Sequence, residues 1–139
     1  MSLCVRNKMF RSYRIVMAAL VLACAVVSCS EKQEKTDLAA RTAELYFGYL
    51  LSGDVTSFVE GMDGYAQLPD AYKTELRGNA AMFAERQHKE HGGLRTVSAQ
   101  RSEADSTVAE VFMSFEYGDG TKEQVLVPMV RRRGLWYMR

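Results

Sequence analysis

The only two histidines of the chain, His88 and His91, are three residues apart, which would place both imidazoles on one face of a helix. Neutral imidazoles in that arrangement can share a metal ion such as zinc, but a tight zinc site needs further ligands. Charged residues separate the pair and two glycines follow it, a pattern that is typical of a solvated helix end. We therefore expect no metal and no cofactor.

Cys29 is the residue with the clearest covalent chemistry. Residues 1–14 contain four basic side chains and no acid, and residues 15–27 are apolar. That apolar run is shorter than the about 20 residues of a membrane-spanning helix and fits a secretory leader. The stretch Val26-Val27-Ser28-Cys29 resembles the bacterial lipobox, in which the cysteine thiol accepts a lipid before the leader is removed. We predict a signal peptide over residues 1–28 and lipidation of Cys29; a buried cysteine in an uncleaved anchor is the alternative.

Removal of the leader changes the charge of the protein. Of the 18 Lys and Arg, four lie in residues 1–28, so 14 remain against 17 Asp and Glu and the net charge becomes about −3. A mildly acidic body has no electrostatic footprint for nucleic acid. Cys4 and Cys24 leave with the leader, so the mature chain cannot form an internal disulfide.

Residues 29–35 are predicted to form a lipidated tether, because residues 30–35 are polar and cannot pack. Several acyl chains on Cys29 would hold the protein to a membrane, its first expected partner. The residue after Cys29 is Ser30 rather than aspartate, which by resemblance to known sorting rules favours the outer membrane. Whether the protein faces the periplasm or the cell surface stays open.

Three stretches of the remaining residues 36–139 have helical signals, over residues 36–53, 54–61 and 69–91. The first carries an apolar stripe of Ala39, Ala43, Tyr46, Phe47 and Leu50. The third carries a stripe of Tyr72, Leu76, Ala80 and Phe83. Gly78-Asn79 lies inside the third stretch, which is therefore one long helix or a kinked or split one. Residues 62–68 are predicted to be a loop.

After Gly93 the apolar period changes from helical to alternating, which predicts strands. One strand buries the face formed by Ala109, Val111, Met113, Phe115 and Tyr117. A three-residue loop at 118–120 pairs Glu116 with Lys122, whereas a two-residue loop would set it against Glu123, so we expect the former. A further strand is predicted over residues 94–101, followed by a polar turn at 102–106.

A final turn at Arg131–Gly134 should contain an even number of residues. Trp136 and Met138 then share a face with Val127 and Met129. Pro128 cannot donate to a sheet, which predicts a free edge or a bulge beside it. The whole is an α+β domain in which three N-terminal helical segments pack on a curved antiparallel sheet of about four strands and form a cone.

Four segments carry a resemblance to a known superfamily: Tyr49-Leu-Leu-Ser-Gly-Asp54, Gly92-Gly93, Tyr117-Gly-Asp-Gly-Thr121 and Gly134-Leu-Trp-Tyr-Met138. With the order of elements, they resemble the nuclear-transport-factor-2-like superfamily, also called cystatin-like or lumazine-binding-like, and within it uncharacterised bacterial lipoprotein domains. The resemblance implies the cone-shaped fold. The matching segments are turns and packing elements, so they say little about activity.

Five aromatic side chains could line the mouth of the cone and bind a small apolar or sugar-like ligand, or they could simply fill the cone. They are Tyr46, Tyr49, Phe83, Phe115 and Trp136. Arg131, Arg132 and Arg133 could meet an acidic headgroup or glycan, or be solvated.

Three functions stay open. The first is a non-catalytic module for ligand binding or protein interaction, anchored at a membrane. Superfamily relatives include isomerases and dehydratases with pocket acids, so the second is an enzyme of that type using Glu110 or Asp63. The third is a structural module that dimerises through the outer sheet face, where Phe112 and Leu126 pair. We expect no enzyme, because the acids fall at caps, turns and exposed positions.

Overall fold

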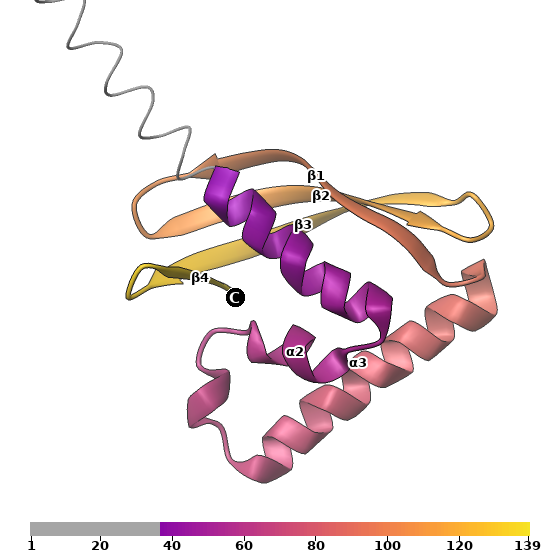
Figure 1. Cartoon of the computed structure of the whole chain (residues 1–139), viewed down its shortest axis with the longest axis horizontal. Coiled ribbons are helices and arrows are strands. Elements are labelled where there is room, and N and C mark those ends of the chain that lie inside the picture. Colours follow the sequence, from indigo (N-terminus) through magenta and orange to yellow (C-terminus); the bar gives the residue numbers. More distant parts are fainter. Residues whose placement is uncertain (1–36) are drawn as a thin grey trace, which may run out of the picture. The chain divides into compact units, whose positions relative to one another are not determined.

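The computed structural model describes residues 37–139, which form an antiparallel sheet with helices packed on one face (Figure 1). The predicted leader, lipidated Cys29 and tether lie outside the described residues. A helix over residues 37–52 crosses the sheet and is followed by α2 (Val55–Glu60), η1 (Tyr65–Gln67) and α3 (Asp70–His91). Among residues 37–139, no helix is both long and apolar enough to cross a membrane.

The helix boundaries follow local capping chemistry. Gly53 ends the 37–52 helix at a φ of +83°, a conformation that glycine adopts without steric cost. The Asp54 carboxylate accepts the Ser57 backbone N–H at 3.0 Å and thereby caps α2. Gly92, with a φ of +75°, terminates α3 by donating its N–H to the His88 carbonyl. These ends confirm the predicted segmentation.

Three details of the helical region differ from the predictions, and one alternative that the sequence left open is resolved. α3 is continuous through Gly78, because that position is exposed and the glycine costs only helix propensity. Pro69 caps α3 instead of occupying its first turn. Tyr72 is 60% exposed and does not belong to the buried stripe. The predicted loop at residues 62–68 contains η1.

The four strands are ordered β1-β2-β3-β4, with β1 at Leu94–Ala104, β2 at Val108–Tyr117, β3 at Lys122–Arg132 and β4 at Leu135–Met138. The predicted register is confirmed, since Glu116 pairs with Lys122 and Val111 with Val127. Gly120 has the expected left-handed φ of +83°. The even loop before β4 is also confirmed, because Met129 pairs with Met138.

Pro128 occupies a site where its missing donor is tolerated. It lies in β3 beyond the last residue of β4, and its carbonyl accepts the Arg139 N–H at 2.9 Å. β1 extends three residues further than predicted, because residues 102–104 continue to pair with β2. The turn that follows is organised by Asp105, whose Oδ1 accepts the N–H groups of Thr107 and Val108.

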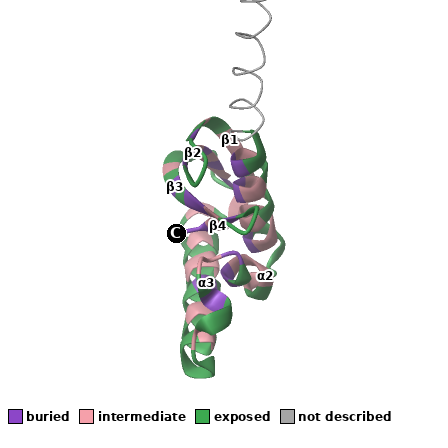
Figure 2. Cartoon of the chain, turned by 90° about the vertical axis from the view of Figure 1, so that its left-hand side faces the viewer, coloured by how far each residue is buried: buried purple, intermediate pink, exposed green. Residues whose placement is uncertain are grey.

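The main core lies between the sheet and the 37–52 helix, and the buried positions of the two layers face one another (Figure 2). It comprises Ala39, Ala43, Ala104, Ala109, Val111, Met113, Phe115, Tyr117, Val127, Met129, Trp136 and Met138. Phe47 fills the space between the layers, with its ring centroid 5.0 Å from that of Phe115 and 5.3 Å from that of Phe58. A second cluster, around Leu50, Val59, Tyr65 and Ala80, joins α2, η1 and α3.

Candidate functional site

The five aromatic residues singled out in the sequence are divided between different surroundings. Phe115 and Trp136 are buried in the main core, and the Tyr46 hydroxyl donates to the Trp136 carbonyl at 3.0 Å. Burial, followed by the neighbouring tyrosines, raises the pKa of Tyr46 above its ordinary value. Tyr49 is half-buried on the 37–52 helix, and Phe83 packs against the second cluster. Tyr46, Phe115 and Trp136 therefore lie together, apart from Phe83; ligand binding by the set stays a prediction.

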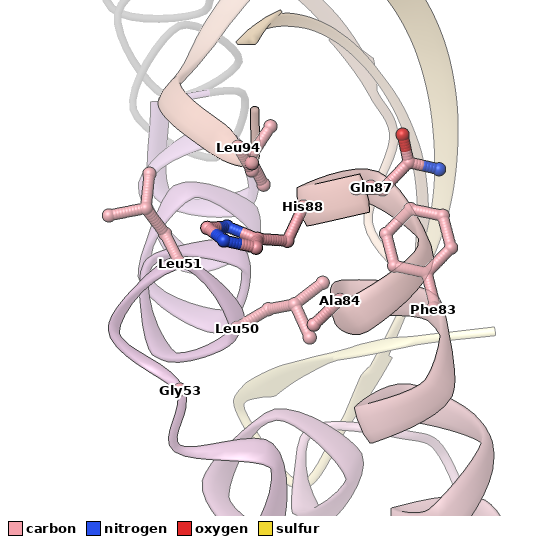
Figure 3. Close-up of a pocket in the computed structure, with 9 residues that line it drawn as sticks. Leu50, Leu51, Gly53, Phe83, Ala84, Gln87, His88 and Leu94 are labelled. Carbon is pink, nitrogen blue, oxygen red and sulfur yellow. The ribbon is translucent and has the colours of Figure 1, made fainter. Parts of the chain in front are cut away.

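A surface groove lies where the 37–52 helix, the end of α3 and the start of β1 converge (Figure 3). Its volume is about 200 Å³, and its lining residues are Leu50, Leu51, Gly53, Phe83, Ala84, Gln87, His88, Gly93 and Leu94. Of the predicted aromatic residues only Phe83 belongs to it. The walls are apolar, and Gln87 and His88 bring an amide and an imidazole to the same opening.

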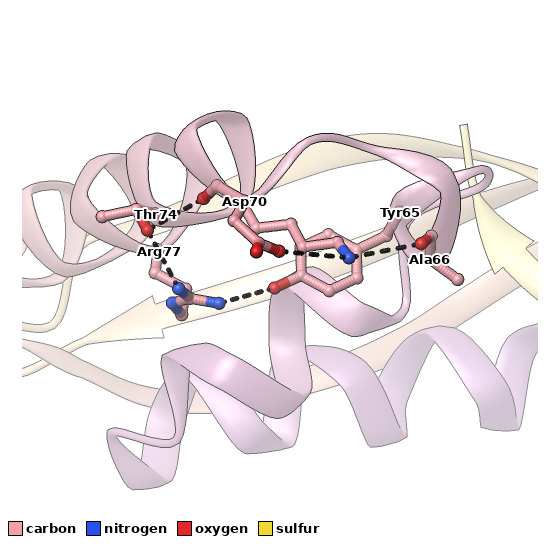
Figure 4. A network of polar contacts seen from close by, with 6 residues as sticks. Tyr65, Ala66, Asp70, Thr74 and Arg77 are labelled. Carbon is pink, nitrogen blue, oxygen red and sulfur yellow. Dashed lines mark hydrogen bonds and ion pairs between the residues drawn. The ribbon is translucent and has the colours of Figure 1, made fainter.

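Helix termination creates this groove. Gly53 ends one helix and the glycine pair after His91 ends the other, so two helix ends stop beside Leu94 without continuing over it. α3 is fixed to η1 at its opposite end by a polar network (Figure 4). There, Arg77 donates to the Tyr65 hydroxyl at 2.8 Å, and Lys73 donates to the Ala66 carbonyl at 3.2 Å. These contacts fix the position of α3, the helix whose C-terminal part lines the groove.

The two histidines have different surroundings. His88 lines the groove, whereas His91 Nδ1 lies 2.9 Å from an Asp119 carboxylate oxygen, with its ring against Tyr117. His91 is thus a partly exposed residue at the predicted helix end that also contacts Asp119, and the expected absence of a metal stays a prediction. The described residues contain no group of three or more His, Cys, Asp or Glu side chains placed to hold a metal.

The acid residues required by the enzyme alternative lie outside the groove. Glu110 is exposed, and Asp63 forms an ion pair with Arg132 at 3.1 Å. Glu44 is a half-buried carboxylate that the sequence analysis missed, and its Oε1 accepts the Ala99 N–H at 2.6 Å beside a bulge in β1. The position of that bulge depends on strand pairing, so no local signal marks Glu44.

The outer sheet face has the predicted cross-strand pair. Phe112 lies opposite Leu126, and the Arg101 guanidinium sits over the Phe112 ring at 4.4 Å. Guanidinium groups are attracted to the face of an aromatic ring. Arg101 thus covers part of the apolar surface through which we expected dimerisation, and self-association stays a prediction.

The Asp119 carboxylate makes stability sensitive to acid. The Thr121 backbone N–H, chiefly, and His91 lower the pKa of Asp119 from 3.8 to about 2. A carboxyl whose pKa is depressed by folding stabilises the native state above its unfolded pKa and loses that effect as the pH falls through the folded pKa. We expect Asp119→Asn to be less stable than the wild type at neutral pH, with the difference disappearing between about pH 4 and pH 2. Urea unfolding across that range measures it; a difference independent of pH would contradict the assignment.

Comparison with known proteins identifies the fold. No known family model and no curated protein matches the sequence. Among solved structures, a protein from Campylobacter jejuni described as an NTF2-like transpeptidase superposes with a TM-score of 0.52 at 16% sequence identity. The match covers 69% of this chain and 92% of that one. The fold is therefore the nuclear-transport-factor-2-like α+β fold that the sequence predicts, with three helices on a curved four-stranded antiparallel sheet.

Proposed function

We propose that the protein is a lipoprotein anchored to the outer membrane through Cys29, and that its domain is a non-catalytic binding module whose ligand occupies the groove beside Phe83. The sequence before Cys29 supports the anchor. The groove is the observation that carries the binding role, because it joins apolar walls to two polar side chains at one opening. Ligand sites commonly combine a mainly apolar lining with a few polar groups that orient the ligand.

The dimensions of the groove restrict the ligand. Its volume of about 200 Å³ is below the roughly 300–1,000 Å³ of pockets that enclose drug-sized molecules. The ligand is therefore a small apolar molecule, or the groove holds only one end of a larger one. Gln87 can donate and accept hydrogen bonds, and His88 can do either according to its tautomer. We expect an apolar body with one or two hydrogen-bonding groups.

The interior of the cone is less suited to this role. Phe47 contacts both Phe58 and Phe115 there, so side chains occupy the space between the helix and the sheet. A ligand entering that space would have to displace packed aromatic rings. The groove requires no such rearrangement, because Leu51 and His88 on its rim are already exposed.

Two alanines on α3 provide a matched test. Ala84 lines the groove, whereas Ala81 is exposed on the same helix. Methionine is a good helix former, so Ala84→Met should fill the groove with little effect on α3. We expect native mass spectrometry of the purified full-length protein to detect a bound small molecule in the wild type and in Ala81→Met, and to show its loss in Ala84→Met. Equal occupancy in all three proteins, or none in any, would contradict the assignment.

A further inference from the structure

The start of the 37–52 helix and two turns of the sheet lie at one edge of the domain (Figure 1). Val108 pairs with Val130, and the Arg131 N–H donates to the Thr107 carbonyl at 2.7 Å, so the β1–β2 and β3–β4 turns are neighbours. Ala39, in the first turn of the helix, belongs to the same core cluster as Ala104 beside the β1–β2 turn. The other end of the helix reaches the groove, at the opposite edge.

This edge exposes three large apolar side chains from three different elements. Leu38, Val108 and Leu135 are 45%, 42% and 61% exposed. Two arginines accompany them: Arg133 is exposed, and Arg131 is half-buried, with its Nε atom buried and without a hydrogen-bond partner. Among residues 37–139, the recorded ion pairs include neither of them. We call these five residues the proximal edge. Exposed apolar groups beside unpaired cations match the boundary between anionic headgroups and acyl chains.

Two acids near this region are engaged with other groups. Asp63 is paired with Arg132. Asp105 directs Oδ1 back to the N–H groups of its own turn, at 2.7 Å from Thr107 N and 3.0 Å from Val108 N. Arg133 lies in the β3–β4 turn with a backbone φ of +50°, and the residue is exposed.

The length of chain before the helix restricts what this edge can reach. Eight residue steps separate Cys29 from Asp37, and a fully extended chain spans at most about 3.5 Å per residue, or about 28 Å in total. The proximal edge, where the helix begins, therefore lies within about 28 Å of a bilayer that holds Cys29, which is close enough for it to rest on that bilayer.

We propose that the proximal edge rests on the bilayer that holds the acyl chains of Cys29. Leu38, Val108 and Leu135 then lie at the headgroup–acyl boundary, and Arg131 and Arg133 meet anionic headgroups. This inference rests on the proposed lipidation. It also predicts how the groove is oriented, because the groove lies at the opposite edge and would face away from the membrane. Its ligand would then come from the aqueous side.

Site-directed spin labelling tests this orientation in the full-length lipoprotein, reconstituted into vesicles of phosphatidylcholine and phosphatidylglycerol. Nitroxides are attached at Leu135→Cys and Val108→Cys on the proximal edge and at Glu90→Cys, an exposed position near the groove edge. Oxygen concentrates in the bilayer and a water-soluble nickel complex stays outside it, so the ratio of their collision rates with the nitroxide reports membrane contact. We expect a high ratio of oxygen to nickel collisions at positions 135 and 108, and a low ratio at position 90. Water-like values at both proximal positions would overturn the proposal.

A second variant tests the electrostatic part. A basic side chain near an anionic surface contributes on the order of a fivefold preference. Arg131→Gln with Arg133→Gln should therefore reduce the membrane signal at position 135 in anionic vesicles and have little effect in neutral ones. An unchanged signal in anionic vesicles would contradict the role of the arginines.

Failure of the anchor gives a different result. A Cys29 sulfur held in a thioether cannot react with the spin label, so the wild-type protein should stay unlabelled. Labelling of the wild type would contradict the proposed function and, with it, the tether on which the orientation depends. An unlabelled wild type with a water-like position 135 would overturn the orientation alone.

Discussion

Trp136→Ala should lower the free energy of unfolding by about 3–5 kcal/mol, as is typical of large-to-small changes in a core. Trp136 is only 4% exposed and belongs to the cluster that joins the sheet to the 37–52 helix. The Tyr46 hydroxyl donates a hydrogen bond to the backbone carbonyl of residue 136, and a backbone bond can survive the side-chain substitution. The loss therefore measures the packing of the indole. Urea unfolding monitored by circular dichroism gives the value.

Trp136→Phe is the matched control. The indole Nε1 is buried and has no hydrogen-bond partner within the described residues. A buried donor without a partner costs about 1–3 kcal/mol, so its removal offsets part of the lost packing. We expect this variant to stay close to the wild type. If phenylalanine were as destabilising as alanine, the indole N–H would have a partner that the structure does not account for.

Gly118→Ala should be the second strongly destabilising change, by about 1–3 kcal/mol, because forced overpacking shifts the backbone. A Cβ at this position would lie 2.5 Å from the Gly92 carbonyl oxygen. The contact joins the end of α3 to the β2–β3 turn, where the Gly118 N–H donates to the Gly93 carbonyl at 2.8 Å. Thermal unfolding should show a lower midpoint for this variant.

Gly78→Ala is also a glycine-to-alanine change, but we expect it to raise the free energy of unfolding, whereas Gly118→Ala should lower it. Gly78 lies inside α3 and is exposed, and an added Cβ would meet no atom within 4 Å beyond its chain neighbours and the backbone of its own helix. Alanine should stabilise the helix by about 0.5–1 kcal/mol, since glycine loses more backbone freedom on folding. A destabilised Gly78→Ala, or an unaffected Gly118→Ala, would contradict the packing described for these positions.

The sheet was largely predictable because strand pairing has discrete outcomes. Only one loop length pairs Glu116 with Lys122, and that register also aligns the apolar residues of β2 and β3 on one face. The end of β1 was less predictable. Residues 102–104 are mostly polar, and their strand structure comes from pairing with β2 and not from any local pattern.

The candidate site was much less predictable than the fold. Leu50, Phe83 and Leu94 come together only because two helices stop at the same edge, and a single sequence contains no signal for that convergence. Aromatic side chains attracted attention because their types suit ligand binding, yet Phe115 and Trp136 contribute to the core. Residue type alone does not distinguish a ligand-binding aromatic from a packing one.

Intact-mass spectrometry of the mature protein isolated from its native membrane tests the central claim most directly. The account predicts a chain that begins at Cys29 and carries diacylglycerol on its sulfur, because the membrane address, the tether and the orientation of the groove all depend on that modification. A chain that retains residues 1–28, or that begins at an unmodified Cys29, would contradict it.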